Sequence, residues 1–323
     1  MLFDNYSRSE AALISTMSEM VVHGVSTRKV SQIVETLCGT SVSKSAVSEV
    51  CKDLSREVED FRNRPLTGPY PFLTVDATYF KVRENHRVIS KALMIAYGTN
   101  AQGHREVLGF ETYPCESADT WTQFLAGLKK RGLTGLLMIT SDAHDGILHG
   151  ISKIFPAVPW QRCQVHFNRN ITDKAPKAYQ AGLRSELFEM FSSKTIEEAR
   201  KKRDEIINDY KEIAEKAMEC LDEGFENAMT AMIMPGRIRQ ACRTTNHLER
   251  LNRELKRRSK VIGIFPNVDS IIRLMGSLLI EHSNVQQSRT AMFSKETYKN
   301  LIQSDIPENL VRIAEEQKAL LAA

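Results

Sequence analysis

The chain has 323 residues, of which 42% are hydrophobic and 26% are charged, a balance that excludes a globally disordered protein. This length suits about two domains. The formal net charge is only +4, so the total charge does not by itself indicate a nucleic-acid partner.

Membrane and secreted classes are disfavoured by the sequence. No apolar run is long enough to span a bilayer, and the N-terminus lacks the charged and then apolar pattern of a secretory signal. The six cysteines are scattered and form no CxxC pair, which is typical of reduced thiols rather than of a disulfide framework. We therefore expect a cytoplasmic protein without a membrane partner.

Residues 1–65 are expected to form an all-α domain. Gly39 would separate two short helices, and a helix pair joined by a glycine-containing turn is typical of a helix-turn-helix. Its second helix would present Ser43 and Lys44 to a DNA groove. A helix pair that binds no DNA is the alternative that this pattern leaves open. Apolar residues recur at helical spacing over residues 11–22, 30–37 and 46–54.

Residues 66–175 have the pattern of a mixed α/β sheet, entered through a linker at 63–71 that holds three prolines and a glycine. Helices are expected at 117–132 and 147–155. The first three strands are joined by short turns, which predicts an antiparallel meander. The strand-like runs lie at 72–83, 87–97, 105–113, 136–142 and 159–167.

The rest of the chain is expected to be helical. Residues 176–236 carry charges of both signs around an apolar stripe, which is typical of a solvated helical insertion. Residues 237–266 contain a strong helix candidate at 244–260. Residues 267–323 show further amphipathic helices.

Three acids stand out by their placement. Asp76 lies in the first strand, Asp142 lies at the C-terminal end of the fourth, and Glu249 lies on the helix at 244–260. A carboxylate in an apolar strand is costly, so Asp76 either bonds to backbone amides or binds a metal. If the first and fourth strands are neighbours, Asp76 and Asp142 can meet, and the helix can add Glu249 by packing against that edge.

Three converging carboxylates repel one another unless cations relieve the repulsion. Mg²⁺ or Mn²⁺ prefers such oxygen ligands. Two ions about 3.5–4 Å apart would activate water on one side of a phosphodiester and stabilise the leaving oxygen on the other. His144, Asp145 and Glu254 lie close to the three acids in sequence and are their nearest rivals for these roles.

The helix around Glu249 is strongly basic. Residues 237–260 hold nine Lys and Arg residues against two acids, an excess larger than the net charge of the whole chain. Such a helix suits DNA phosphates beside a metal site. The alternative is a solvated helix in which Glu249 and Glu254 pair with Arg253 and Arg258. The DNA contacts expected here are Arg243, Asn246, Arg250, Arg253, Lys256, Arg257 and Arg258.

Four motifs together resemble the Mutator-type transposases of bacterial insertion sequences. They are VDATYFKVR, SDAHDG, WQRCQVHFNRN and TTNHLERLNRELKRR, in this order. Asp142 lies 66 residues after Asp76, and Glu249 lies 107 residues after Asp142. The resemblance covers nearly the whole chain, from about residue 24 to about residue 267.

The resemblance implies an RNase H-like fold with a catalytic Asp-Asp-Glu triad, here Asp76, Asp142 and Glu249, and a helical insertion before the glutamate. It also implies a Cys-x2-His signature, matched by Cys163 and His166. Two ligands are too few for a zinc site, so we interpret this pair as supporting or structural residues. Trp160 either fills the core, which we favour, or stacks on a base near the break.

We therefore expect a Mg²⁺- or Mn²⁺-dependent transposase that cuts at the terminal inverted repeats of its element and joins the freed 3′-OH to target DNA. Such a protein is expected to act as a homodimer on nucleoid DNA in bacteria. Family members usually carry a longer segment before the helix at 11–22, which implies a shortened chain. The alternatives are a DNA-binding remnant or regulator without catalysis and a simple RNase H-like nuclease.

Overall fold

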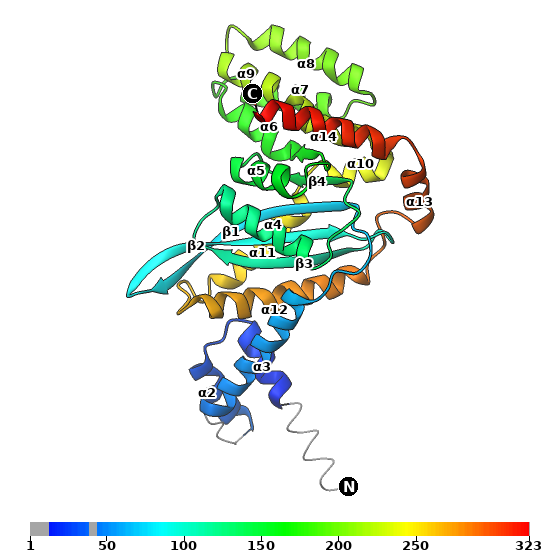
Figure 1. Cartoon of the computed structure of the whole chain (residues 1–323). Coiled ribbons are helices and arrows are strands. Elements are labelled where there is room, and N and C mark those ends of the chain that lie inside the picture. The colour runs from blue at the N-terminus through cyan, green and yellow to red at the C-terminus, as the bar shows by residue number, and fades with distance from the viewer. Residues whose placement is uncertain (1–12, 39–43, 323) are drawn as a thin grey trace.

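The structure is a computed structural model that describes residues 13–38 and 44–322 (Figure 1). A mixed sheet lies at its centre with helices on both faces. Its five strands are ordered β3-β2-β1-β4-β5. Their bounds are β1 Phe72–Glu84, β2 Arg87–Thr99, β3 Arg105–Tyr113, β4 Met138–Ser141 and β5 Trp160–Arg162.

The sheet topology confirms the predicted meander. β1, β2 and β3 pair antiparallel, and Asn85 and His86 adopt positive φ at the tight β1–β2 turn. β4 then pairs parallel with β1, and β5 pairs parallel with β4. The first and fourth strands are therefore neighbours.

Each face of the sheet has its own core. On one face, α4 (Ala118–Lys130) and α5 (Asp145–Ile154) bury Trp121, Leu125 and Ile147 against Leu73 and Val75. α4 begins at a capping box on Ser117, which fixes its N-terminus.

The opposite face of the sheet is covered by α11 (Asn246–Ser259), α12 (Val268–Gln287) and the end of α3 (Lys44–Asn63). Val58, Leu251 and Met275 are buried there against Leu93 and Phe110. Because side chains alternate along a strand, Thr74 and Asp76 point to this face while Leu73 and Val75 point to the other.

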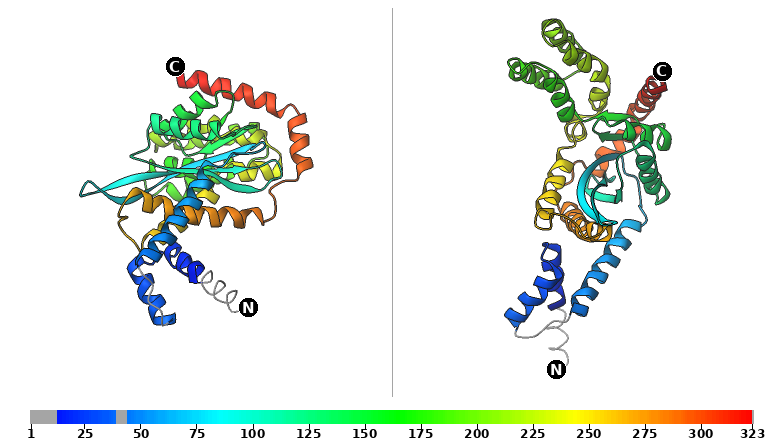
Figure 2. Two further views of the ribbon diagram at one scale, coloured as in Figure 1. Left: turned by 60° about the horizontal axis from the view of Figure 1, so that its bottom comes forward. Right: turned by 90° about the vertical axis from the view of Figure 1, so that its left-hand side faces the viewer.

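Four helices form a separate helical body after β5, with a core of their own that includes Phe167, Leu187, Leu221 and Phe225. The views in Figure 2 show this body extending away from the sheet. The strand predicted at 159–167 is shorter than expected: β5 ends at Arg162 and α6 starts at once. The four helices are α6 Gln164–Asp173, α7 Gln180–Phe191, α8 Ile196–Tyr210 and α9 Glu215–Met229.

The C-terminal helices return to the sheet. Phe293 and Leu310 pack with Phe72 and Met138 beside α10. Phe72 and Met138 are the first residues of β1 and β4, so the C-terminal helices cover the N-terminal ends of these two strands. The remaining elements are the short helix η1 (Thr230–Ile233), α10 (Gly236–Cys242), α13 (Lys295–Gln303) and α14 (Ile306–Ala322).

The N-terminal helices form a small body at the other end of the molecule (Figures 1 and 2). α2 (Thr27–Cys38), α3 and the helical residues 13–22 share a core of Met17, Val30, Val34, Val47 and Val50. The predicted Gly39 turn lies outside the described residues.

The close approach of α12 to the sheet depends on a glycine, Gly276, which has no Cβ. A Cβ on Gly276 would lie 2.5 Å from Val58 Cγ1 and 2.9 Å from Phe110 Cζ, so overpacking in Gly276→Ala should cost about 1–3 kcal/mol. Gly127 on α4 has open space around it, and Gly127→Ala should stabilise the chain by up to about 1 kcal/mol. Urea unfolding of both variants checks this pair, and equal midpoints would contradict it.

Candidate active site

Asp76 points from β1 toward α11 and is partly buried. The Ala77 backbone N–H donates to its Oδ1 at 2.8 Å, and Asn252 Nδ2 donates to its Oδ2 at 2.7 Å. Burial raises the pKa of Asp76 to about 7, with the nearby Asp142 as the next cause, while His166 lowers it. The carboxylate is therefore held firmly in a place that disfavours its charged form.

Asp142 follows directly on β4. The parallel register pairs Thr74 with Thr140, so Asp76 and Asp142 each lie two residues beyond that pair, on the same face of neighbouring strands. Burial raises the pKa of Asp142, while His166 and His144 oppose the shift. Its Oδ1 is buried and has no hydrogen-bond partner among the described residues.

Glu249 comes from the far end of the chain, in the first turn of α11. Leu248, Leu251 and Leu255 form the buried stripe that packs this helix on the sheet. Glu249 Oε1 lies 2.9 Å from His166 Nε2, which is an ion-pair distance. This oxygen forms no hydrogen bond with a described residue, so its contact with His166 is an ion pair.

The position of α11 is fixed by hydrogen bonds to the ends of β4 and β5. They all join the segment that enters α11 to residues flanking Asp142 and His166. These bonds hold the first turn of α11, and with it Glu249, close to the two aspartates. Thr140 Oγ1 donates to Cys242 O at 2.7 Å, Gln164 N–H donates to Arg243 O at 3.0 Å, and the Thr245 N–H and hydroxyl both donate to Cys163 Sγ at 3.3 Å.

His166 is the cation among these acids. Its pKa is raised to about 9, chiefly by the Cys163 side chain and also by Glu249 and Asp142, against the opposing effect of burial. Burial tends to raise the pKa of the Cys163 thiol, but the nearby His166 and the hydrogen bonds from Thr245 outweigh this and lower it. His166 Nδ1 has no well-formed hydrogen bond to a described residue, so its contact with Cys163 is a close approach.

The three predicted acids thus gather around one histidine, with Asp76 and Asp142 side by side and Glu249 next to His166. Within residues 13–38 and 44–322, no three His, Cys, Asp or Glu side chains converge closely enough to hold a metal ion. The donor chemistry nevertheless fits a hard cation, because Asp142 Oδ1 is a buried carboxylate oxygen that accepts no hydrogen bond from the described residues, and Glu249 Oε1 pairs only with the His166 imidazole.

The rival residues have other partners. Glu254 pairs with Arg257 and Arg258, which hold its pKa down to about 2. His144 caps α5 by accepting a hydrogen bond from Gly146 N–H at 3.2 Å. Asp145 is exposed at the first position of α5.

The residues expected to contact DNA fall into two groups. Arg250, Arg253 and Lys256 are exposed on α11 and make no ion pair with a described residue. Arg257 and Arg258 are the ones that pair with Glu254, and Arg258 also contacts His23 of the N-terminal helices. Glu249 does not make the alternative pair with Arg253.

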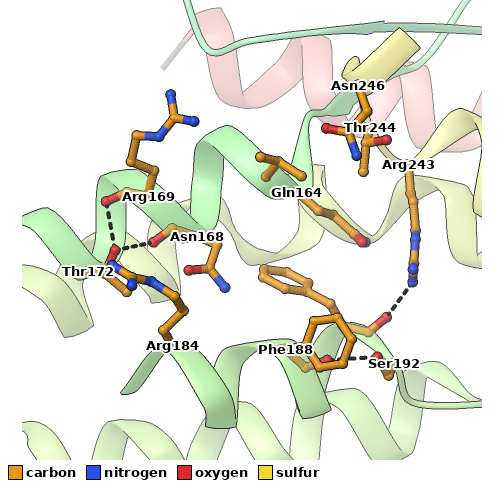
Figure 3. A pocket seen from close by; sticks show the side chains of 12 residues that line it. Gln164, Asn168, Arg169, Thr172, Arg184, Phe188, Ser192, Arg243, Thr244 and Asn246 are labelled. Atoms are coloured by element: carbon orange, nitrogen blue, oxygen red, sulfur yellow. Dashed lines mark hydrogen bonds between the residues drawn. The ribbon is translucent and has the colours of Figure 1, made fainter. Parts of the chain in front are cut away.

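The other expected contacts lie nearer the helical body or outside the description. Arg243 Nη1 donates to Phe191 O at 3.2 Å, and Asn246 is exposed at the start of α11. Both line a pocket beside α6 (Figure 3). Ser43 lies outside the described residues, and Lys44 is the first residue of α3.

Trp160 is buried in β5, with 6% of its surface exposed. Its Nε1 donates to Ser141 Oγ at 2.9 Å, next to Asp142. Its backbone N–H donates to Gln317 Oε1 at 2.8 Å, which ties α14 to the sheet. The indole therefore packs under the strand that carries Asp142.

Two polar residues of the site were not singled out from the sequence. Asn252, 8% exposed, follows Glu249 by one helical turn, and that spacing on α11 is the signal that could have found it. Glu116 precedes α4, and its pKa is raised by burial and, against an opposing effect of His144, by Asp142. It also contributes to the raised pKa of Asp76.

Asn252→Ala should lower DNA-processing activity by about 10- to 100-fold, because the amide that orients the Asp76 carboxylate is lost. Asn252 is a positioning residue, so the variant should need more divalent ion for half-maximal activity. Activity measured across a range of Mg²⁺ concentrations checks this, with Ser259→Ala at the end of the same helix as the control. An unchanged dependence on Mg²⁺ would contradict the role.

Comparison with known proteins identifies the family. A sequence profile described as "Transposase, Mutator family" matches residues 1–288. The transposase for insertion sequence element IS256 in transposon Tn4001 of Staphylococcus aureus is 45% identical over 283 residues, covering 87% of this chain and 72% of the relative.

Two further relatives agree. The transposase for insertion sequence element ISRM5 of Rhizobium meliloti is 38% identical, and the match covers 88% of this chain and 71% of the relative. The transposase for IS1081 of Mycobacterium tuberculosis is 39% identical, covering 87% and 68%. None of the helices in the described ranges has the length and apolar character needed to cross a bilayer. The profile match and these three relatives show that the chain belongs to the Mutator family of transposases.

Proposed function

We propose that this transposase cleaves DNA strands at the ends of its insertion sequence and joins the freed 3′-OH to target DNA, with Asp76, Asp142 and Glu249 as its catalytic acids. The observation that carries the proposal is the gathering of these acids around His166, beside the C-terminal end of β4. The strand order and the two parallel pairings support an RNase H-like core for this chemistry.

Mg²⁺ or Mn²⁺ is the cofactor that these acids suit. Asp142 would supply a buried oxygen without a hydrogen-bond donor, Glu249 an oxygen that now pairs with His166, and Asp76 an oriented carboxylate. When bound, such ions supply charge stabilisation at the scissile phosphate and lower the pKa of water or of a 3′-OH. Relief of the repulsion between Asp76 and Asp142 supports ion binding between these two acids.

The residues of the chain have separate tasks in this scheme. Asn252 holds the Asp76 carboxylate, and the bonds around Cys163 and Thr245 hold the start of α11. His166 balances part of the negative charge and keeps Glu249 in place. The exposed cations Arg250 and Arg253, with Lys256, would neutralise DNA phosphates beside the acids.

DNA is the partner, and we propose that it runs along α11 toward the N-terminal helices. Arg258 contacts His23, which places the end of the basic helix α11 beside the N-terminal helices. We propose that α2 and α3 act as a helix-turn-helix that reads the terminal inverted repeats. Two ends must be joined in one reaction, so we expect a homodimer.

A strand-transfer assay tests the function. The purified chain is incubated with a labelled duplex that carries the end of its own element, a supercoiled target plasmid and Mg²⁺. The proposal predicts a nick at the element end and joined products, both of them absent in EDTA. Nicking at many unrelated positions without joined products would instead identify a simple nuclease.

A further inference from the structure

A pocket of about 450 Å³ opens beside the candidate active site, between α6, α7 and the segment that enters α11 (Figure 3). Two elements that carry residues of that site, α6 and the start of α11, also line the pocket. Val165 lines the pocket and is followed on α6 by His166, while Asn246 lines it one turn before Glu249 on α11. A DNA strand at the acids would therefore lie next to the pocket mouth.

The pocket is positively charged. Arg169, Arg184 and Arg243 line it, and its described lining contains no acid. Arg169 and Arg184 are exposed and form no ion pair with a carboxylate of the described residues, whereas Arg243 is bound to Phe191 O. In the view of Figure 3, Arg169 and Arg184 lie on the left and Arg243 on the right. Free guanidinium groups in a concave site suit a phosphate.

An exposed aromatic ring forms part of the floor. Phe188 on α7 has 65% of its surface exposed, although phenylalanine is usually buried. The core contacts of α7 are made by Leu183, Leu187 and Met190, so Phe188 is not needed to hold the helix in place. Asn168 and Asn246 add amide groups to the lining of the pocket (Figure 3).

We propose that this pocket takes one nucleotide of the bound DNA, rotated out of the duplex next to the cut. The base would stack on Phe188, the amides of Asn168 and Asn246 would face its edge, and Arg169 and Arg184 would hold its phosphates. Aromatic stacking and arginine contacts are the general means by which proteins hold unpaired bases. The inference rests on the proposed function, because it needs DNA at the acids.

Fluorescence of 2-aminopurine tests the pocket without any cleavage. The Asp142→Asn chain is mixed with duplexes of its element end that carry 2-aminopurine at successive positions around the cut. One position should brighten several-fold on binding, because a base leaves the stack there. Adding Phe188→Ala should remove most of this rise. Tyr179→Ala, an exposed aromatic outside the pocket lining, should leave it intact.

Binding measurements give a second readout. A mispair at the bright position lowers the cost of extrusion, so it should tighten binding to the Asp142→Asn chain by about ten-fold or more and should do so much less when Phe188→Ala is added. Arg184→Gln should weaken binding of both duplexes. No brightening at any position, or the same brightening with and without Phe188→Ala, would overturn the proposal.

Free nucleotides are the other source of this chemistry. A deoxynucleoside triphosphate that binds the chain without DNA, loses affinity in Phe188→Ala and blocks the brightening would assign the pocket to soluble nucleotides and overturn the proposal. Failure of the proposed function is distinguishable, because it would appear as absent strand transfer by the unmodified chain while the fluorescence result stands.

Discussion

Replacing any one of the three acids, in Asp76→Asn, Asp142→Asn or Glu249→Gln, is expected to lower cleavage at the element end by on the order of 10³-fold. Each change keeps the shape of the side chain but removes a negative charge from the site where phosphate charge must be balanced. Each variant should still bind the end duplex, because the exposed cations of α11 are untouched. Gel-shift and cleavage assays on the same preparations separate the two effects.

Glu254→Gln is the matched control for this experiment. Glu254 lies on the same helix as Glu249, but it pairs with Arg257 and Arg258 rather than with His166. Its loss should change cleavage by only a few-fold. If Glu254→Gln were as inactive as Glu249→Gln, α11 would be presenting a different face to the DNA.

Asp76→Asn is also expected to stabilise the free chain above neutral pH. The pKa of Asp76 is raised from 3.8 to about 7 in the folded protein. Below about pH 4 the Asp76 carboxyl is protonated in both the folded and the unfolded chain, and its full contribution to the stability of the fold is present. That contribution is lost as the pH rises toward 7, because the unfolded chain releases its proton first. A shift of this size corresponds to roughly 4 kcal/mol at pH 8.

Urea unfolding in EDTA at pH 5 and pH 8 measures this effect. The amide introduced by Asp76→Asn carries no charge, so the variant should exceed the unmodified chain in stability at pH 8, and the gap should narrow toward pH 4. A variant that is less stable at pH 8 would show that the carboxylate is well accommodated in the fold. Asp76→Asn should therefore lose activity and gain stability, as expected where a buried charge is kept for function at a cost in stability.

Much of the fold follows from local patterns. The alternation in β1 and the helical stripe of α11 are set by residues close in sequence, so both could be predicted. Asp76 and Asp142 were expected to meet if β1 and β4 paired, and the parallel register places them two residues beyond the same pair. The sequence alone could not decide that pairing, because it depends on the packing of the whole sheet.

The parts that could not be predicted depend on contacts between distant segments. The run at 159–167 alternates like a strand, but Phe167 and Ile171 lie one helical turn apart and are buried in the core of the helical body, so the segment becomes α6. The contact between His166 and Glu249 likewise joins residues that local spacing cannot relate.

We propose that Asp76, Asp142 and Glu249 form one ion-binding site. Mn²⁺ binding to the chain in complex with its end duplex, followed by isothermal titration calorimetry, tests this most directly. The account predicts binding by the unmodified chain and by Glu254→Gln, and its weakening by at least about ten-fold in each of the three triad variants. Mn²⁺ binding of equal strength in the unmodified chain and in all three variants would contradict it.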